Sequence, residues 1–381
     1  MKKHTTSAGM LHMLSTGFML LTVIAVFSGC MKQNAPKALK DFHQVNLVAN
    51  NDEYSALHID PMLQNAWGLA FSSGGTAWVS SQAAHLSTVY DKEGATARPP
   101  VNIPSPGGAT GGNPTGVVFS GSTTDFILSN GQPARFIFVG LDGVLSAWNG
   151  AAGNNAIRIP TNSPNSVYTG LTLAANGGAN YLYAADFKAG KIAVWDKSFA
   201  PVTMAFKDPF LPAGYSPFNI QVVGSWLYVM YAKVAPDGDE QAGQGLGYVS
   251  IFTTAGNFVK RFASKGTLNA PWGIASAPAA FFADTDGDKD DEVSKYMKSK
   301  NNTPQTLILV GNFGDGRINA YTTDGDFVGQ LRAHGRTMVI EGLWALSFPP
   351  ATATTIDPNR LYFTAGPDDE ADGLFGYIIK E

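Results

Sequence analysis

The sequence predicts an all-β fold, a six-bladed β-propeller in which a strand from the N-terminal region closes the sixth blade. Three observations predict it: a short strand motif recurs six times, each copy is followed by further segments of strand composition, and one strand-like segment near the start has no neighbour to pair with. The copies lie at intervals close to the roughly 40 to 50 residues of a four-stranded propeller blade. The longest interval follows the fifth copy and contains an acidic insertion.

The recurring motif is a short apolar segment whose second residue is usually glycine. Such a column predicts innermost strands that approach one another closely around a central channel. A β-sandwich with recurrent turn glycines is the competing interpretation, and the even spacing argues against it. The copies are WGLAF from Trp67, TGVVF from Thr115, TGLTL from Thr169, FNIQV from Phe218, WGIAS from Trp272 and EGLWAL from Glu341. The aligned second residues are Gly68, Gly116, Gly170, Asn219, Gly273 and Gly342.

Further strand-like segments follow each copy of the motif. Second segments such as RFIFVG and WLYVMYA, and third segments such as KIAVWD and RINAY, are rich in aromatic and β-branched residues. Fourth segments follow in five units, as VNIP, AIRIP, PVTMAF, FVKRF and FVGQL. The sixth unit has none before Glu381, so we expect the segment from Phe42 to Ala49 to supply its outer strand and remove an exposed sheet edge.

The composition is that of a turn-rich globular protein and excludes some classes of partner. Glycine accounts for 42 of the 381 residues, and charged residues for 15%, against a usual charged share of about 25%. A net charge of -4 offers no basic surface for nucleic acid. We therefore expect no nucleic-acid partner, and we expect a monomer.

The N-terminus has the order of a secretory signal. Lys2 and Lys3 precede an apolar run from Phe18 to Phe27, and Ser28 and Gly29 precede Cys30, the only cysteine. The run is shorter than the roughly 20 residues that a membrane-spanning helix needs. With one cysteine the chain forms no internal disulfide, so its stability must come from its core.

This segment resembles a bacterial lipoprotein signal, in which a cysteine after small residues receives lipid. The resemblance implies a signal peptide over residues 1–29 and a lipid-anchored tether over 30–40. It also implies a membrane anchor at Cys30 and a place in the bacterial cell envelope, on the outer membrane, the periplasmic face or the cell surface. The strand repeats place the propeller over residues 41–381, with an acidic insertion around 280–304. The alternative is an ordinary signal in which Cys30 is incidental.

Longer stretches carry a second resemblance. They include NAWGLAF, DPFLPAGYSPFNIQ, LNAPWGIASAP, LVGNFGDGRINAY and LYFTAGPDDEADGLFGYI. In these the chain resembles an uncharacterised family of exported bacterial β-propellers, some of whose members carry PEP-CTERM sorting tails. Asp372 stands before GLFG, where the resemblance implies histidine. More remotely, the fold resembles calcium-dependent phosphotriesterase and gluconolactonase-like propellers.

Chemistry is expected at the mouth of the channel, where first strands begin and second strands end. Glu341, Asn219, Asp186 and Asn312 fall there, and their oxygens suit Ca²⁺ or Mg²⁺. Gluconolactonase-like propellers use a similar set, with the metal polarising a lactone or phosphoester, and Glu341 and Asp186 are then the candidate catalytic carboxylates. The alternative is that such side chains satisfy turn amides. Asp315, Trp67 and Trp272 are candidate ligand-binding residues, although both tryptophans also suit a plug of the channel.

The insertion contains a second candidate calcium site. Carboxylates alternate in the sequence DTDGDKDDE, and a glycine-containing loop of this kind can wrap one Ca²⁺. The spacing does not match an EF-hand, and a solvated acidic loop is the alternative. The candidate ligands are Asp284, Asp286, Asp288 and Glu292.

Three functions remain open on the sequence. The leading hypothesis is an extracytoplasmic binding or scaffold module that takes an unknown protein or small molecule, because no GxSxG, HExxH or phosphate-loop motif is present. The alternative is a divalent-metal-dependent hydrolase of small lactones or phosphoesters with its site at the channel mouth. The third is a structural envelope protein, which a filled channel would favour.

Overall fold

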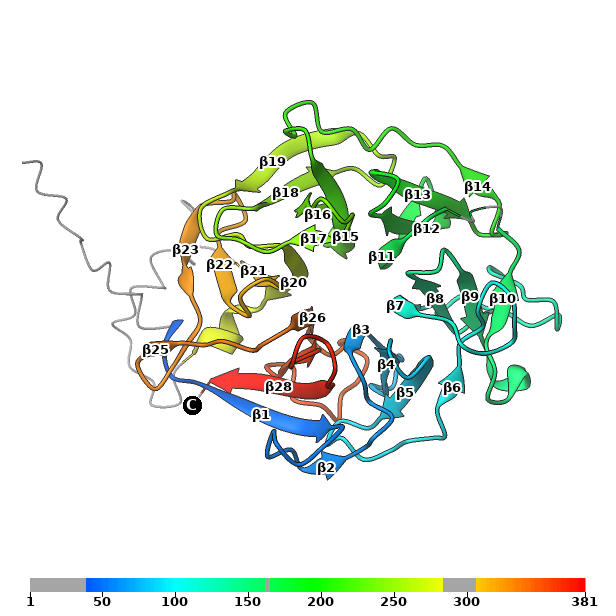
Figure 1. The fold of residues 1–381 in the computed structure, drawn as a ribbon, viewed down its shortest axis with the longest axis horizontal. Coiled ribbons are helices and arrows are strands. Elements are labelled where there is room, and N and C mark those ends of the chain that lie inside the picture. The colour runs from blue at the N-terminus through cyan, green and yellow to red at the C-terminus, as the bar shows by residue number, and fades with distance from the viewer. Residues whose placement is uncertain (1–38, 162, 164, 284–305, 381) are drawn as a thin grey trace, which may run out of the picture. The chain divides into compact units, whose positions relative to one another are not determined.

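The predicted six-bladed propeller is confirmed by a computed structural model of the chain. The structure describes residues 39–161, 163, 165–283 and 306–380, all within the compact unit Ala35–Glu381. Six sheets of four or five mainly antiparallel strands are arranged in a ring around a central axis (Figure 1). In the part of the chain that is described, no helix is long and apolar enough to cross a membrane.

Blades 1 to 5 are each built from strands that are consecutive in sequence, with the innermost strand first. Blade 1 is β3 (Ala66–Phe71), β4 (Ala77–Ser81), β5 (Leu86–Tyr90) and β6 (Val101–Asn102). Blade 2 is β7 (Pro114–Phe119), β8 (Phe136–Gly140), β9 (Leu145–Trp148) and β10 (Ile157–Ile159). Blade 3 is β11 (Tyr168–Asn176), β12 (Ala179–Asp186), β13 (Lys191–Asp196) and β14 (Pro201–Val202).

The later blades carry additions at their edges. Blade 4 is β15 (Tyr215–Val223), β16 (Trp226–Val234), β18 (Gly247–Phe252) and β19 (Phe258–Ser264), with β17 (Glu240–Gln241) paired to β16. Blade 5 is β20 (Pro271–Ala277), β21 (Leu307–Asn312), β22 (Ile318–Tyr321) and β23 (Phe327–Gln330). Blade 6 is β26 (Leu343–Ser347), β27 (Leu361–Ala365), β28 (Leu374–Lys380), β1 (Phe42–Ala49) and β2 (His58–Ile59). A hairpin of β24 (Arg332–Ala333) and β25 (Arg336–Thr337) precedes β26, and short 3-10 turns are Gly150–Ala152 and Ala279–Phe282.

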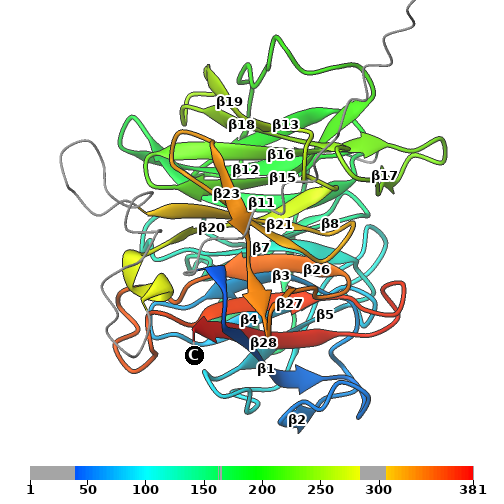
Figure 2. The ribbon, with the colours of Figure 1, turned by 90° about the vertical axis from the view of Figure 1, so that its left-hand side faces the viewer.

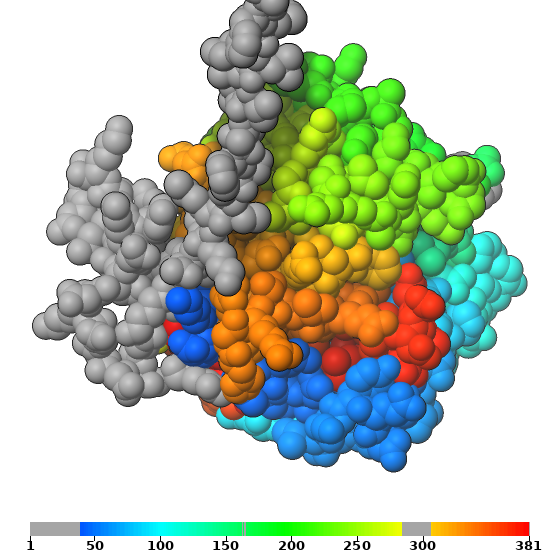
Figure 3. All heavy atoms as spheres, turned by 60° about the vertical axis from the view of Figure 1, so that its left-hand side comes forward, coloured from blue at the N-terminus to red at the C-terminus, as the bar shows by residue number. Residues whose placement is uncertain are grey.

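The ring is closed by pairing the first long strand with the last, as the sequence predicted. β1 runs antiparallel to β28 from Phe42 opposite Lys380 to Ala49 opposite Leu374, and the two strands lie side by side in Figure 2. Figure 3 shows the described N-terminal residues (blue) beside the C-terminal ones (red) on one face.

A polar clamp secures this closure. The Asp372 carboxylate accepts hydrogen bonds from Asn50 Nδ2 (2.7 Å), Asn51 Nδ2 (3.0 Å) and Tyr54 Oη (2.5 Å). Burial opposes ionisation of Asp372, but the bonds from Tyr54 and the two asparagines outweigh it and lower its pKa. The clamp therefore joins the loop after β1 to the turn before β28 through a carboxylate that these donors hold ionised.

Neighbouring blades pack against each other through apolar side chains. Trp78 of blade 1 stacks on Phe136 of blade 2 with ring centroids 3.9 Å apart, and the Arg98 guanidinium lies 4.5 Å from the Trp148 ring centroid. Aromatic pairs of this kind add to the burial of area. They fix the angle between adjacent sheets and hence the positions of the strand ends at the channel.

The glycine column allows close approach around the axis. A Cβ on Gly68 would lie 2.2 Å from the Thr115 carbonyl oxygen, and one on Gly273 would lie 2.6 Å from that of Trp344. Both distances are too short for a real carbon atom, so the innermost strands could not pack at this spacing with alanine there. The β-ladder is also irregular within every innermost strand at the repeated motif.

The sixth copy of the motif was aligned wrongly from sequence. Gly342 precedes β26, with φ +61, and the irregularity lies between Leu343 and Leu346. Ala345, not Gly342, lines the same axial void as Gly68 and Gly273. The equivalent motif is therefore LWAL, in which Trp344 occupies the place of Trp67 and Trp272.

Blade 3 corrects a second expectation. The segment PVTMAF was predicted to form its fourth strand, but only Pro201 and Val202 pair with β13. The chain then leaves β13 and runs along the outer rim toward β15 (Figure 1). The reason is a set of contacts with blade 4, described below.

Candidate functional site

The interior of the channel is filled by an aromatic plug. Trp344 is fully buried and lies between Trp67, with ring centroids 3.7 Å apart, and Phe313, with ring centroids 4.0 Å apart. Phe187, Phe218 and Trp272 belong to the same cluster. Trp67 and Trp272 are only 4% and 5% exposed, so they pack within the plug and do not form an open pocket floor.

Two of the predicted metal ligands are buried and bonded to the backbone. Asp186, at the end of β12, accepts hydrogen bonds at Oδ1 from the amides of Val167 and Ala189, both at 3.2 Å. Its Oδ2 has no partner among the described residues. Asn219 donates from Nδ2 to the Trp272 carbonyl at 2.9 Å and accepts at Oδ1 from the Ile220 amide at 2.8 Å. Both side chains thus hold turns or strands in place.

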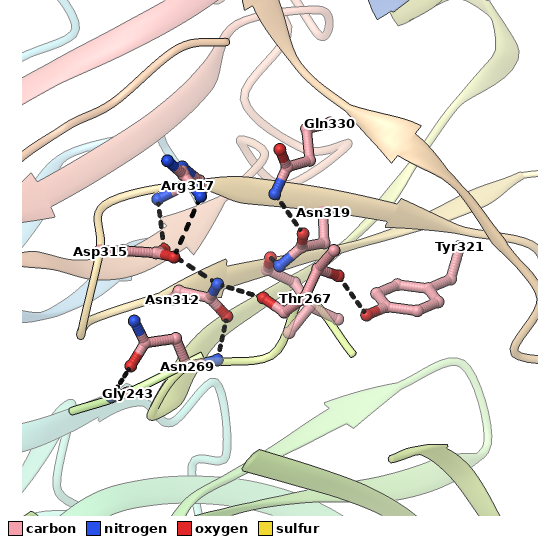
Figure 4. Close-up of polar contacts among 10 residues, drawn as sticks. Gly243, Thr267, Asn269, Asn312, Asp315, Arg317, Asn319, Tyr321 and Gln330 are labelled. Atoms are coloured by element: carbon pink, nitrogen blue, oxygen red, sulfur yellow. Dashed lines mark hydrogen bonds and ion pairs between the residues drawn. The ribbon is translucent and has the colours of Figure 1, made fainter. Parts of the chain in front are cut away.

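Asn312 is the centre of a polar network at the end of β21 (Figure 4). Its Nδ2 donates to the Thr267 carbonyl at 2.8 Å and to Asp315 Oδ1 at 3.0 Å, and its Oδ1 accepts from the Asn269 amide at 3.1 Å. Asp315 also lies 3.7 Å from the Arg317 guanidinium. The network extends through Asn269 Oδ1, which accepts from the Gly243 amide at 2.6 Å. It therefore joins the loops of blades 4 and 5 at the channel mouth.

The structure brings two of the predicted residues, Asp315 and Glu341, to one pocket. This channel-mouth pocket has a volume of about 610 Å³ and is also lined by Phe313, Asp369 and Glu370. Asn219 lines a separate axial void of about 20 Å³. Asp186 lines neither of these spaces. The four-residue metal set predicted from the sequence thus divides between different environments.

Sequence reasoning missed Asp369 and Glu370. Both follow the end of β27, and second-strand ends were the positions searched for ligands. The sequence PDDEADG after this strand was the available signal.

Two glutamates near the pocket bind protons more strongly than usual. Burial raises the pKa of Glu370, a hydrogen bond from Asn65 opposes this, and Asp239 and Asp369 raise it further. The pKa of Glu240 in β17 is raised from 4.5 to about 7, mainly by burial and further by the nearby charges of Glu370 and Asp239. Negative charge is thus concentrated at the rim of the pocket, and it falls when the two glutamates take up protons.

The remaining candidates lie outside the described residues. These are Asp284, Asp286, Asp288 and Glu292 of the insertion, and Cys30. Within the described residues, no group of three or more histidine, cysteine, aspartate or glutamate side chains is arranged to hold a metal ion.

Comparison with known proteins identifies relatives of the whole propeller. The uncharacterized protein R648 of Acanthamoeba polyphaga mimivirus is 32% identical over 354 residues, which are 89% of this chain and 80% of that protein. The chain belongs to this family. The uncharacterized protein L690 of the same virus is also 32% identical, over 89% of this chain and 86% of its own. These family members are viral, whereas the resemblance seen in the sequence implied a bacterial family.

Solved structures show a more distant likeness. No family model matches the chain. A streptogramin B lyase aligns with a TM-score of 0.48 at 13% identity, over 88% of this chain and 96% of the lyase. A gluconolactonase from Xanthomonas campestris aligns with a TM-score of 0.47 at 13% identity, over 84% and 86% of the two chains.

Proposed function

We propose that this protein is an extracytoplasmic binding module that captures cationic groups in the channel-mouth pocket. The ligand is a small organic cation or a basic side chain of a partner protein. The observation that carries the proposal is the lining of the pocket: it contains Asp315, Glu341, Asp369 and Glu370, and no lysine or arginine is among its described lining residues.

The arrangement suits a cation for two physical reasons. Carboxylates gathered in a concave, partly desolvated site concentrate negative potential, which attracts positive ligands. Phe313 lines the pocket, is only partly buried and stacks on Trp344. An aromatic face beside carboxylates attracts ammonium and guanidinium groups through its quadrupole.

Two unpaired carboxylates are the most direct contacts for such a ligand. Glu341 and Asp369 are both exposed, and neither forms an ion pair or side-chain hydrogen bond with the described residues. Asp315 and Glu370 are held by Asn312 and Asn65 respectively. The pocket thus combines two fixed carboxylates with two that are free to approach a ligand.

The contacts at the channel mouth favour this function over a metal-dependent hydrolase. The hydrolase reading requires Asn219 and Asn312 to offer their amide oxygens to a metal. Both oxygens instead accept backbone amide hydrogen bonds. Releasing them would leave buried backbone donors unpaired, at a cost of about 1–3 kcal/mol each.

Calorimetric titration with choline, spermidine and trilysine tests the proposal, with succinate as the anionic control. We expect saturable binding of at least one cation and none of succinate. The double substitution Glu341→Gln with Asp369→Asn should weaken binding by about tenfold or more, because two charged contacts are lost. Asp237→Asn, which removes an exposed carboxylate that does not line the pocket, should change affinity less than about threefold. An equal loss of affinity in the double variant and in Asp237→Asn would refute a specific site.

The anchor forms a separate part of the proposal. Cys30 follows Ser28 and Gly29 after an apolar run, which supports lipidation. Labelled palmitate should be incorporated into the full chain in a bacterial host and lost in Cys30→Ala. A wild-type chain that remains unlabelled while a known lipoprotein is labelled would remove the anchor from the proposal.

A further inference from the structure

The outer edge of blade 3 lacks half of its covering strand. In blade 4, β19 pairs with β18 from Tyr248 to Phe252, and in blade 6, β1 pairs with β28 over its whole length. In blade 3, β14 pairs only with Val194 and Trp195 of β13. The first half of β13, from Lys191 to Ala193, has no outer neighbour among the described residues.

The missing pairing leaves a backbone donor and acceptor at Ile192. Residues of an antiparallel strand alternate between bonding to one neighbour and to the other. On β13 the outward positions are identified by the Asp196 amide, which donates to the Ala200 carbonyl, and by Val194 opposite Val202. The next outward position is Ile192, whose ladder partner in a continued β14 would be Met204. The described part of the chain provides no hydrogen bond to either group of Ile192 on this side.

The strand is missing because contacts with blade 4 draw the chain away. Phe206 donates its amide to the Gly256 carbonyl at 3.0 Å. Two residues later the Asp208 carboxylate forms an ion pair with Arg261 and accepts from Ser250 Oγ. Asp208 is 8% exposed, so this contact is a buried anchor that is costly to break.

The divergence opens a slot of about 680 Å³, which we call the blade 3 slot. One wall is the edge of β13 from Lys191 to Trp195, and the other is the segment from Val202 to Asp208. Tyr168, Pro217 and Tyr231 also line it. The Tyr231 hydroxyl makes no hydrogen bond with the described residues, so a polar group within the slot is free to accept or donate.

The charge of the slot is opposite to that of the chain. Lys191 and Lys207 line it, are exposed, and form no ion pair within the described residues. Asp208 is the one carboxylate among its described lining residues, and Arg261 compensates it. The slot is therefore locally positive on a chain of net charge -4. Its walls also present apolar side chains, including Val194, Met204 and Leu211.

We propose that the blade 3 slot binds an extended, acidic segment of a partner protein by β-strand addition. The segment pairs with the N–H and C=O of Ile192, which lack a partner among the described residues, and completes the fourth strand that β14 begins. Alternate side chains of such a segment point to opposite sides, so apolar residues enter the slot while acidic residues meet Lys191 and Lys207. This site is separate from the cation pocket at the channel mouth and has the opposite charge preference.

The test uses two capped, fluorescein-labelled heptapeptide pools and fluorescence anisotropy. In one pool valine, isoleucine or threonine alternates with glutamate, and in the other lysine replaces glutamate. We expect the glutamate pool to bind saturably and the lysine pool to bind at least about tenfold more weakly. Binding should also protect the Ile192 amide against hydrogen exchange.

A pair of substitutions at one position separates the backbone from the side chain. Ile192→Pro removes the outward N–H and leaves the inner ladder with β12 intact, because proline is tolerated on an edge whose N–H faces outward. Ile192→Ala removes similar packing and keeps the N–H. We expect about tenfold weaker peptide binding in Ile192→Pro than in Ile192→Ala, as for loss of one backbone hydrogen bond.

Each other outcome overturns the proposal. No saturable binding of the glutamate pool, equal binding of both pools, or equal affinity of the two Ile192 variants would exclude strand addition by an acidic segment. A dimer in sedimentation velocity that Ile192→Pro dissociates and Ile192→Ala does not would assign the slot to a second copy of the chain instead. Failure here leaves the cation proposal untouched, since choline binding is measured independently.

Discussion

Glu240 offers the sharpest test of the electrostatics at the channel mouth. Burial and the neighbouring Glu370 and Asp239 raise its pKa from 4.5 to about 7. A folded pKa above the unfolded value means that the protonated glutamate is favoured in the folded state. Its contribution to stability is complete below pH 4.5 and is lost as the pH rises through about 7. Glu240→Gln, which stays neutral at every pH, should therefore unfold less readily than the wild type at pH 8.

The magnitude follows from the size of the pKa difference. One pKa unit corresponds to about 1.36 kcal/mol, so the change from 4.5 to about 7 sets an upper limit of about 3.4 kcal/mol. β17 has only two residues and Glu240 is partly exposed, so water and local relaxation reduce the penalty. We expect Glu240→Gln to gain about 1–2 kcal/mol of unfolding free energy at pH 8 and close to nothing at pH 4.

Urea unfolding followed by tryptophan fluorescence measures this difference, with midpoints compared at pH 4 and pH 8. Glu53→Gln is the matched control, because it makes the same chemical change at a glutamate that is exposed to solvent. An equal gain in both variants, or a gain in Glu240→Gln that does not depend on pH, would refute the argument. A loss of stability at pH 8 would show that Glu240 is ionised and paired in the folded protein.

Four further outcomes are expected. Asp372→Ala should lower the free energy of unfolding by about 1–3 kcal/mol at pH 7, because the closure clamp is lost. Since the pKa of Asp372 is lowered, this loss should shrink as the pH falls below about 4 in chemical unfolding. A loss that persists at that pH would contradict the clamp. Gly273→Ala should lower the free energy of unfolding by about 1–3 kcal/mol in thermal melting, since its Cβ would meet the Trp344 carbonyl. The control Gly107→Ala, whose Cβ would have nothing within 4 Å, should leave stability nearly unchanged. Trp344→Ala should cost about 3–5 kcal/mol in the same assay, as expected for a fully buried ring stacked on both faces. Choline affinity measured by calorimetry should rise between pH 5 and pH 8 as Glu240 ionises, and an affinity that falls would oppose the cation proposal.

The fold could be predicted from sequence because its constraints are local and repeated. An innermost strand needs a small residue at the axis, so glycine recurs at Gly68, Gly116 and Gly273. The sixth copy was misaligned because EGLW and LWAL both fit a short apolar pattern. The tryptophan that starts three of the motifs, at Trp67, Trp272 and Trp344, was the better guide, since these rings meet in the plug.

The features that sequence reasoning missed depend on contacts between distant residues. The segment from Pro201 to Phe206 has good strand composition, but Asp208 binds Arg261 in the next blade, 53 positions along the chain. No local pattern reveals that competition. Likewise, the oxygens chosen from strand ends do not line one pocket. The Asn219 oxygen accepts from the Ile220 amide within β15, and the Asn312 oxygen accepts from the Asn269 amide. The carboxylates that do share a pocket include two from the loop after β27.

The pairing of β1 with β28 also sets the order in which the molecule can fold. Phe42 and Lys380 are neighbours in the finished sheet, yet they are separated by nearly the whole propeller in sequence. Contacts between such distant residues carry a large loop-closure cost and slow the final step of folding. During synthesis β1 must remain unpaired with β28 until the last strand has emerged, and an open strand edge of this kind invites wrong partners. We therefore expect ring closure to be the slow and aggregation-sensitive stage, and a peptide of β1 supplied separately to a chain that lacks it to restore the folded ring.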